Sequence, residues 1–120
     1  MEISDLEIYK LSREISRTAW AVYSAFDWST KKVIGDQWVT SVDSVGANIA
    51  EGFGRYHFAD KNKFNYNARG SLIEAKHWTN LLHERTLLSS DVHGNLNEYF
   101  DRLLHGLNAY IKATKDQIPR

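Results

Sequence analysis

A glycine-rich segment, SVGANIAEGFGR at residues 44–55, is the part of the chain whose composition most resembles a phosphate-binding loop. A dinucleotide-binding loop needs the pattern Gly-x-Gly-x-x-Gly between a strand and a helix. Gly52 and Gly54 provide the first two glycines, but His57 occupies the third position and the glycines end a helical pattern. The Gly-Lys-Ser/Thr ending of a nucleoside-triphosphate-binding loop is absent from the sequence. We therefore expect no phosphate-binding loop here.

Glu74 and His77 form the only Glu-x-x-His pair of the sequence, a spacing that supplies two metal ligands from one helix. A carboxylate-bridged di-metal site in a helical bundle needs a second such pair and a glutamate from each of the other two helices. The chain has no cysteine, and its five histidines lack the partnered serine or aspartate of a nucleophilic triad. The arginine–histidine spacing of the HEPN ribonucleases is also absent. We predict no catalytic residue, metal, cofactor or small-molecule substrate, and keep a metal enzyme based on Glu74 and His77 as a third alternative.

Basic residues gather in one stretch of the chain, residues 55–76, which contains five lysines and arginines but only two acidic residues. Basic side chains interleaved with aromatic ones are typical of surfaces that bind nucleic acid by phosphate contact and base stacking. The whole chain, however, has 15 basic and 15 acidic residues, whereas dedicated nucleic-acid-binding proteins usually carry a basic excess. The alternative is a solvated helix face. The candidate nucleic-acid contacts are Arg55, Lys61, Lys63 and Arg69, with Tyr56 and Tyr66 among them.

The spacing of apolar residues predicts four amphipathic helices, because residues three or four apart share one face of a helix. The predicted helices span residues 5–27, 36–54, 60–88 and 94–116, and the polar segment 27–36 is expected to be a loop. Four such helices favour a single all-α domain, residues 1–120, folded as an up-down-up-down four-helix bundle. The expected core stripes are Ile8, Leu11, Ile15, Ala19, Val22 and Phe26; Trp38, Val42, Val45, Ile49 and Phe53; Phe64, Ala68, Leu72, Ala75, Thr79 and Leu82; and Leu96, Phe100, Leu103, Leu107, Ile111 and Thr114.

One face of the second predicted helix carries only small residues, because Gly46, Ala50 and Gly54 recur at every fourth position. Such a face lets another helix or another subunit approach closely. Close packing would offset the cost of about 1 kcal/mol that a glycine inside a helix carries relative to alanine. A polar stripe beside this face is either solvated or part of a polar network at a helix or subunit junction. Its residues are Ser44, Asn48, Glu51 and Arg55, the last two spaced for an i,i+4 ion pair.

Composition and hydropathy suggest a cytoplasmic protein without a membrane segment. The acidic N-terminal stretch does not resemble a targeting peptide, and no apolar run approaches the roughly 20 residues that span a bilayer. Several aromatic residues fall outside the core stripes, which indicates a partner surface and predicts self-association. These residues are Tyr9, Trp20, Tyr23, Tyr66 and Trp78.

The segments ANIAEGFGR, residues 47–55, and KFNYNARGSLIEAKHW, residues 63–78, resemble the signature of the 23S rRNA intervening-sequence proteins. This family is also called the four-helix-bundle proteins and is related to the accessory proteins of diversity-generating retroelements. The resemblance extends to LNAYIKATK, residues 107–115. It implies a cytoplasmic bacterial four-helix bundle without enzymatic activity, commonly assembled as a homopentamer. At Val39 and Thr40 the chain departs from the basic residues of many members.

We therefore expect a non-catalytic, homo-oligomeric accessory protein that contacts RNA or a protein that handles nucleic acid. The alternative is a protein–protein interaction scaffold that binds no nucleic acid.

Overall fold

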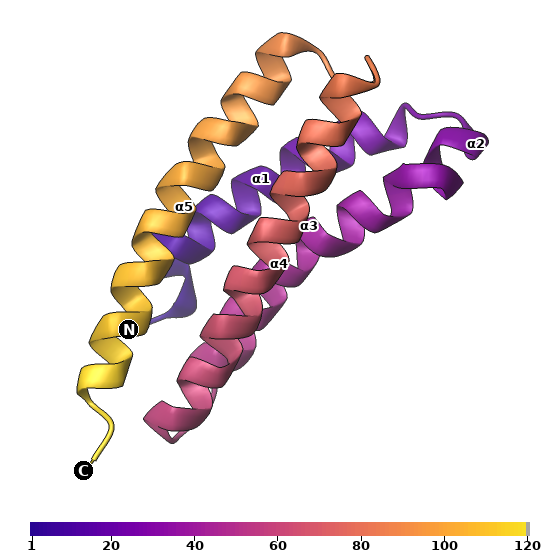
Figure 1. Cartoon of the computed structure of the whole chain (residues 1–120). Helices are drawn as coiled ribbons and strands as arrows, with labels where there is room; N and C mark the ends of the chain where they lie inside the picture. The colour runs from indigo at the N-terminus through magenta and orange to yellow at the C-terminus, as the bar shows by residue number, and fades with distance from the viewer. Residues whose placement is uncertain (120) are drawn as a thin grey trace.

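The computed structural model describes residues 1–119, and every regular element in that range is helical (Figure 1). The segments α2, η2 and α3 follow one another without interruption and form one continuous helix, in which η2 is a π-helical turn. The chain thus builds four long helices. The elements are η1 (Ile3–Asp5), α1 (Glu7–Ser24), α2 (Trp28–Thr30), η2 (Lys31–Gly35), α3 (Asp36–Phe53), α4 (Phe58–Glu84) and α5 (Ser90–Asp116).

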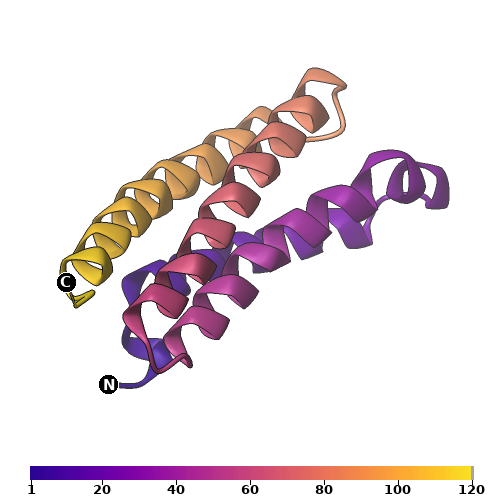
Figure 2. The ribbon, with the colours of Figure 1, turned by 60° about the horizontal axis from the view of Figure 1, so that its bottom comes forward.

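The four long helices pack as an elongated bundle of about 50 × 23 × 23 Å (Figure 2). Helix α1 packs against α3 and α5, and α4 packs against the same two helices, so α1 and α4 lie diagonally across the bundle. Both termini and the α3–α4 connection lie at one end, whereas the α1–α2 and α4–α5 connections lie at the other (Figure 1). The predicted all-α, up-down-up-down bundle is confirmed.

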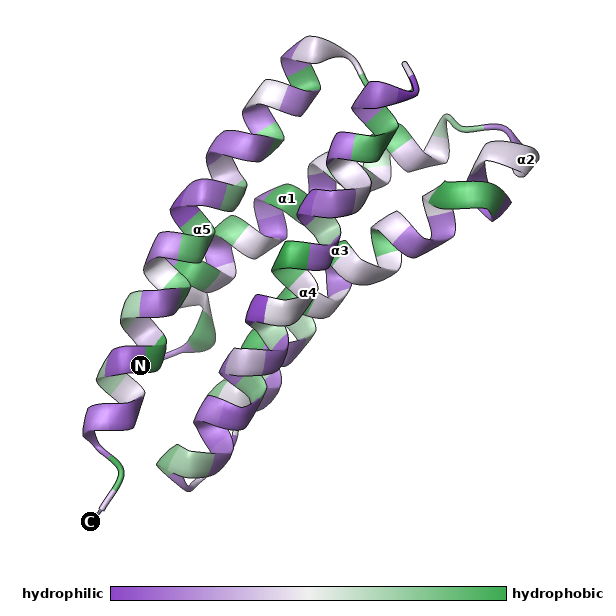
Figure 3. Cartoon of the chain, viewed as in Figure 1, coloured by the Kyte–Doolittle hydropathy of each residue, from purple (hydrophilic) through white to green (hydrophobic). Residues whose placement is uncertain are grey.

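The core follows the apolar stripes, which face inward while polar residues cover the outside (Figure 3). Only Val22, Phe26, Phe53 and Phe64 of the expected core residues keep part of their surface exposed. Burial of a large apolar side chain stabilises the fold by about 1.5–3 kcal/mol, so these stripes account for most of the packing energy. The single polar atom of the buried Trp38 is satisfied, because its indole Nε1 donates to Thr79 Oγ1 at 2.9 Å.

The expected loop at residues 27–36 is wrong, because this segment is helical. Asp27 caps the start of the helix by accepting a hydrogen bond from the Thr30 backbone N–H at 2.7 Å. The π-helical turn then accommodates one extra residue, which shifts the phase of the side chains and hides the helix from a search for a regular 3.6-residue period. Within this turn Ile34 and Gly35 are buried.

The hairpin between α1 and this helix is closed by a contact that is tighter at Gly35 than a Cβ atom normally makes. A Cβ atom at Gly35 would lie 3.1 Å from the Tyr23 ring and 3.2 Å from the Phe26 ring. The Tyr23 hydroxyl donates to Asp36 Oδ1 at 2.5 Å, and Lys32 Nζ lies 3.1 Å from Asp36 Oδ2. The hydrogen bond from Tyr23, helped by Lys32, holds the pKa of Asp36 below its usual range.

The end of α4 and the start of α5 differ from the expected positions, because local turns and capping residues set them. Helix α4 ends at Glu84 instead of residue 88, and Thr86 in the following turn adopts a positive φ of 60°. Helix α5 starts at Ser90 instead of residue 94, because Ser89 Oγ accepts a hydrogen bond from the Val92 backbone N–H at 3.2 Å.

Candidate nucleic-acid interface

The four basic residues singled out from the sequence lie in the α3–α4 connection and on the first four turns of α4. We call them the α4-end cluster: Arg55 in the connection, and Lys61, Lys63 and Arg69 on α4. Helices α3 and α4 approach closely here, since a Cβ atom at Gly52 would lie only 3.0 Å from the Lys61 carbonyl oxygen. Lys61 Nζ donates to the Phe53 carbonyl oxygen at 3.0 Å and thereby caps the end of α3. The turn is therefore held by packing and by capping.

Each cation of the α4-end cluster lies over an aromatic ring, an arrangement that stabilises both groups. The Arg55 guanidinium is 4.7 Å from the centre of the Phe64 ring, and Lys63 Nζ is 6.0 Å from the same centre. Arg69 lies 4.9 Å from the centre of the Tyr66 ring, and Lys61 lies 5.8 Å from that of Phe53. The sequence indicated cations near aromatic residues, but it did not show that Phe53 and Phe64 supply three of these contacts.

The α4-end cluster does not form one continuous basic face. Lys61 and Lys63 are two residues apart and therefore point about 200° apart around α4. Arg55 is paired with Glu51 at 2.6 Å, and Arg69 donates to Asn108 Oδ1 at 3.0 Å on α5. The structure thus brings Arg55 and Lys63 together on Phe64 and directs Arg69 towards α5.

The small face of α3 is only partly a packing face within one chain. Gly46 is buried, and a Cβ atom there would lie 3.0 Å from Ser12 Oγ on α1. Ala50 is half-buried beside a hollow, whereas Gly54 is exposed and a Cβ atom there would meet only carbonyl oxygens of its own helix at 3.7 Å. No other helix of this chain approaches Gly54 closely, so packing against another subunit stays a prediction for this position. Gly52, which sequence spacing did not single out, makes the close contact instead.

The polar stripe of α3 lies on the surface of the chain. Glu51 and Arg55 are exposed and form the expected i,i+4 pair. Asn48 is half-buried and donates from Nδ2 to the Ser44 carbonyl oxygen at 2.8 Å, one turn earlier in its own helix. Within the part of the chain that the structure describes, the stripe makes no hydrogen bond or ion pair to another helix, and its one cation–π contact is the Arg55 guanidinium over the Phe64 ring.

The remaining candidates are separated by the fold. Glu74 and His77 are exposed, and residues 1–119 contain no group of three potential metal ligands. Among the aromatic residues assigned to a partner surface, Trp20 and Tyr66 are exposed. The other three lie at the edges of the core and pack against it: Tyr9, Tyr23 and Trp78.

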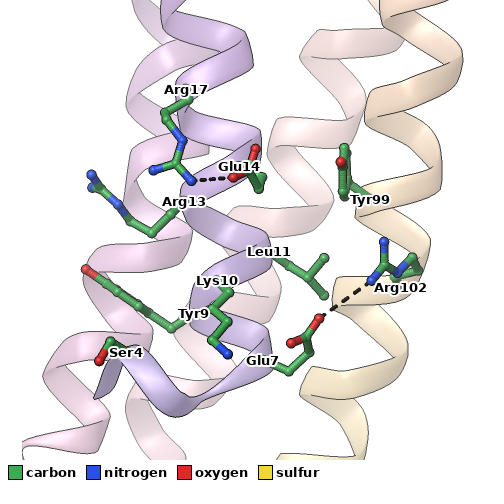
Figure 4. Close-up of a pocket in the computed structure, with 10 residues that line it drawn as sticks. All are labelled: Ser4, Glu7, Tyr9, Lys10, Leu11, Arg13, Glu14, Arg17, Tyr99 and Arg102. Atoms are coloured by element: carbon green, nitrogen blue, oxygen red, sulfur yellow. Dashed lines mark hydrogen bonds and ion pairs between the residues drawn. The ribbon is translucent and has the colours of Figure 1, made fainter. Parts of the chain in front are cut away.

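A second basic surface, which the sequence interpretation missed, lies on α1 (Figure 4). Lys10, Arg13 and Arg17 occupy successive outward turns of α1, and we call them the α1 stripe. They border a groove of about 480 Å³ whose other wall carries Tyr99 and Arg102 of α5. The sequence carried a signal for it, since the spacing of three and four residues is the one that places core residues on a common face. A count of charge along consecutive residues could not find it, because Glu14 lies between the cations in sequence.

No helix within residues 1–119 combines the length and the apolar character that a membrane span requires.

The sequence has no match among the curated proteins compared. Among solved structures, the fold is similar to that of a protein from Bacteroides thetaiotaomicron described as a protein of unknown function from the S23 ribosomal protein family. The two chains share 23% sequence identity with a TM-score of 0.80, over 88% of this chain and 95% of the other. The family model described as 23S rRNA-intervening sequence protein matches residues 4–109. The chain therefore belongs to the 23S rRNA-intervening sequence protein family.

Proposed function

We propose that the protein is a non-catalytic, self-associating accessory of the bacterial cytoplasm that contacts RNA through the α4-end cluster. A variant of this proposal is that the same cluster contacts a protein that handles nucleic acid instead of contacting RNA itself. A scaffold that binds proteins only is the alternative. Exposed aromatic side chains favour the scaffold, with Trp28 75% and Tyr56 88% exposed.

The observation that carries the proposal is the pair of cations on Phe64. Arg55 approaches the ring from the α3–α4 connection, and Lys63 approaches it from the first turns of α4. Lys63 has no carboxylate within ion-pair distance in the described chain, so its charge remains available to a phosphate. Cations beside aromatic rings are the combination with which proteins bind single-stranded nucleic acid.

The test is the affinity for single-stranded RNA at several salt concentrations. Arg55→Glu combined with Lys63→Glu should weaken binding for all sequences alike and make the plot of log K against log salt shallower by about 1.4, or 0.7 for each lost phosphate contact. The matched control is Lys112→Glu with Lys115→Glu, which changes the charge equally on the exposed C-terminal turns of α5. Binding that the first pair leaves unchanged would rule out the α4-end cluster, and absence of RNA binding by the wild-type protein would favour the scaffold.

We also propose that the chain assembles as a homopentamer. The family resemblance supports an assembly of five subunits. The half-buried Ala50, which lies beside the hollow between α1 and α3, supports a neighbouring subunit at that hollow. Light scattering should give about 69 kDa for five chains of 13.8 kDa each. A mass of one chain at micromolar concentration would contradict self-association.

A further inference from the structure

We propose that the α1 stripe and the groove beside it form a second binding site for single-stranded RNA. The inference rests on the proposed function only for the class of ligand, since the α1 stripe and the α4-end cluster share no residue. Helices α1 and α4 lie diagonally across the bundle, so their outward faces point in opposite directions. A strand bound to the α1 stripe therefore does not need the α4-end cluster.

The α1 stripe presents cations in a row along one helix. Lys10, Arg13 and Arg17 are exposed, while Leu11 and Ile15 between them are buried. The last cation lies seven positions after the first, which corresponds to about 10 Å along the helix axis. The cations thus form a line that can follow a phosphate backbone over several nucleotides.

The groove keeps an excess of positive charge after its internal ion pairs are counted. Glu14 pairs with Arg17, and Glu7 Oε1 lies 3.6 Å from Arg102 Nη2 (Figure 4). Four cations and two carboxylates line the groove, on a chain whose formal net charge is zero. Within residues 1–119, no carboxylate lies at ion-pair distance from the other two cations of the α1 stripe. Lys10 and Arg13 are therefore the cations that the fold itself does not neutralise.

Aromatic rings accompany the cations, which points to nucleic acid rather than to an acidic protein segment. Tyr9 of α1 and Tyr99 of α5 are among the residues that line the groove, and Arg102 lies 5.7 Å from the centre of the Tyr99 ring. Trp20, which is 60% exposed, continues the line of cations one turn beyond Arg17. An acidic peptide would use the charges alone, whereas unpaired bases can stack on the exposed ring and the phosphates can meet the cations.

The hollow surface continues along α1 towards Trp20. Arg13 lines the main groove and two further hollows. The hollow of about 350 Å³ contains Ala50 and is the one assigned above to a neighbouring subunit, whereas the hollow of about 300 Å³ contains Trp20 and is the one that the RNA would follow. Asp43 of α3 lines both of these hollows and is the carboxylate that an RNA strand would have to avoid. A strand that follows the outward face of α1 stays beside the three cations of the α1 stripe and meets Glu14, whose charge Arg17 already balances.

The experiment measures the fluorescence anisotropy of labelled oligouridylate of about 20 nucleotides with the full-length protein. The test variant is Lys10→Gln/Arg13→Gln/Arg17→Gln, and its matched control is Arg85→Gln/Lys112→Gln/Lys115→Gln, which removes three exposed cations elsewhere. The test variant should bind at least about tenfold more weakly at about 50 mM salt and show a slope shallower by about 2. The control should stay within about twofold of the wild type.

Removal of the Trp20 ring tests separately how much base stacking contributes to RNA binding. Trp20→Ala should weaken RNA binding about fivefold or more, as expected for the loss of one stacked base, whereas Trp28→Ala should not. An oligoglutamate of equal length should bind more weakly than the RNA and should be insensitive to Trp20→Ala. Oligoglutamate that binds as tightly as RNA would assign the stripe to an acidic protein and overturn the proposal.

The outcomes separate this inference from the proposed function. If the α1 variant loses RNA while Arg55→Glu/Lys63→Glu retains it, the α1 site stands and the α4-end site fails. The reverse result overturns the α1 site and leaves the proposed function intact. An α1 variant that binds RNA like its control, but has an altered mass by light scattering, would show that the stripe is a subunit contact instead.

Discussion

Gly52→Ala is expected to destabilise the protein, although alanine is normally preferred to glycine inside a helix. The added Cβ atom would lie 3.0 Å from the Lys61 carbonyl oxygen, 3.2 Å from Phe64 Cβ and 3.3 Å from Asn65 Oδ1. The first of these contacts is to backbone, which cannot move without shifting the start of α4. Overpacking of this kind costs about 1–3 kcal/mol, and alanine recovers up to about 1 kcal/mol through its helix propensity.

Because the tightest contact is to backbone, the overpacking cost should lie at about 2–3 kcal/mol, and the net destabilisation at about 1–2 kcal/mol. For a chain of this length, with an unfolding entropy of about 2.1 cal/mol/K per residue, this corresponds to a fall in Tm of about 4–8 °C. The buried Asn65 opposes relaxation of the site, because its Nδ2 donates to Asn62 Oδ1 at 3.1 Å and Asn62 Nδ2 donates to the Ile111 carbonyl oxygen at 3.1 Å. A shift of α4 would strain both hydrogen bonds.

Gly54→Ala is the matched control, two residues away in the same connection. Its Cβ atom would have ordinary contacts, and the backbone φ of −79° suits any residue. We expect stability unchanged or raised by up to about 1 kcal/mol. Both variants should be unfolded by heat and urea at one protein concentration, because self-association makes Tm depend on concentration. Equal stability of Gly52→Ala and the wild type would refute the close contact between α3 and α4.

Two further changes probe other parts of the molecule. Burial lowers the pKa of His93 below its ordinary 6.5, and the charge of the stacked His83 lowers it further. The unfolded chain therefore takes up this proton more readily than the folded one, so the stability should fall as the pH drops below 6.5. His93→Gln, whose side-chain amide can pair with Asn80 Oδ1, should flatten the dependence of the urea midpoint on pH between about 7.5 and 5; an unchanged slope would contradict the assignment. Ala50→Leu has room in the hollow between α1 and α3, so it should change chain stability by less than about 1 kcal/mol yet reduce the mass measured by light scattering; an unaltered assembly would remove Ala50 from the subunit contact.

The helices and their buried faces could be predicted from the sequence because core periodicity is a local signal. Each helix repeats its apolar residues at helical spacing. Trp38 of α3, Leu72 of α4 and Leu103 of α5 belong to these repeats, and the structure buries all three. The segment 27–36 escaped prediction because the π-helical turn breaks that spacing. Three aromatic residues lie at the margins of the buried stripes, where one helical wheel cannot distinguish the edge of the core from the surface.

The candidate site was harder to predict, because it depends on how two elements meet. Spacing alone could not show that Gly52, rather than Gly54, faces α4, since the choice depends on the angle at which α4 leaves the connection. Nor could it show that Arg55 and Lys63 share one ring. The α1 stripe, in contrast, was available from helical spacing and was hidden only by counting charge along consecutive residues.

The most direct test of the central claim is the salt dependence of wild-type binding to single-stranded RNA. The proposed contacts predict a linear fall of log K with log salt, with a slope of about −1.4 for Arg55 and Lys63 alone and about −3.5 with the α1 stripe included. No binding at low salt, or binding that is independent of salt, would contradict the claim that this protein contacts RNA through its basic surfaces.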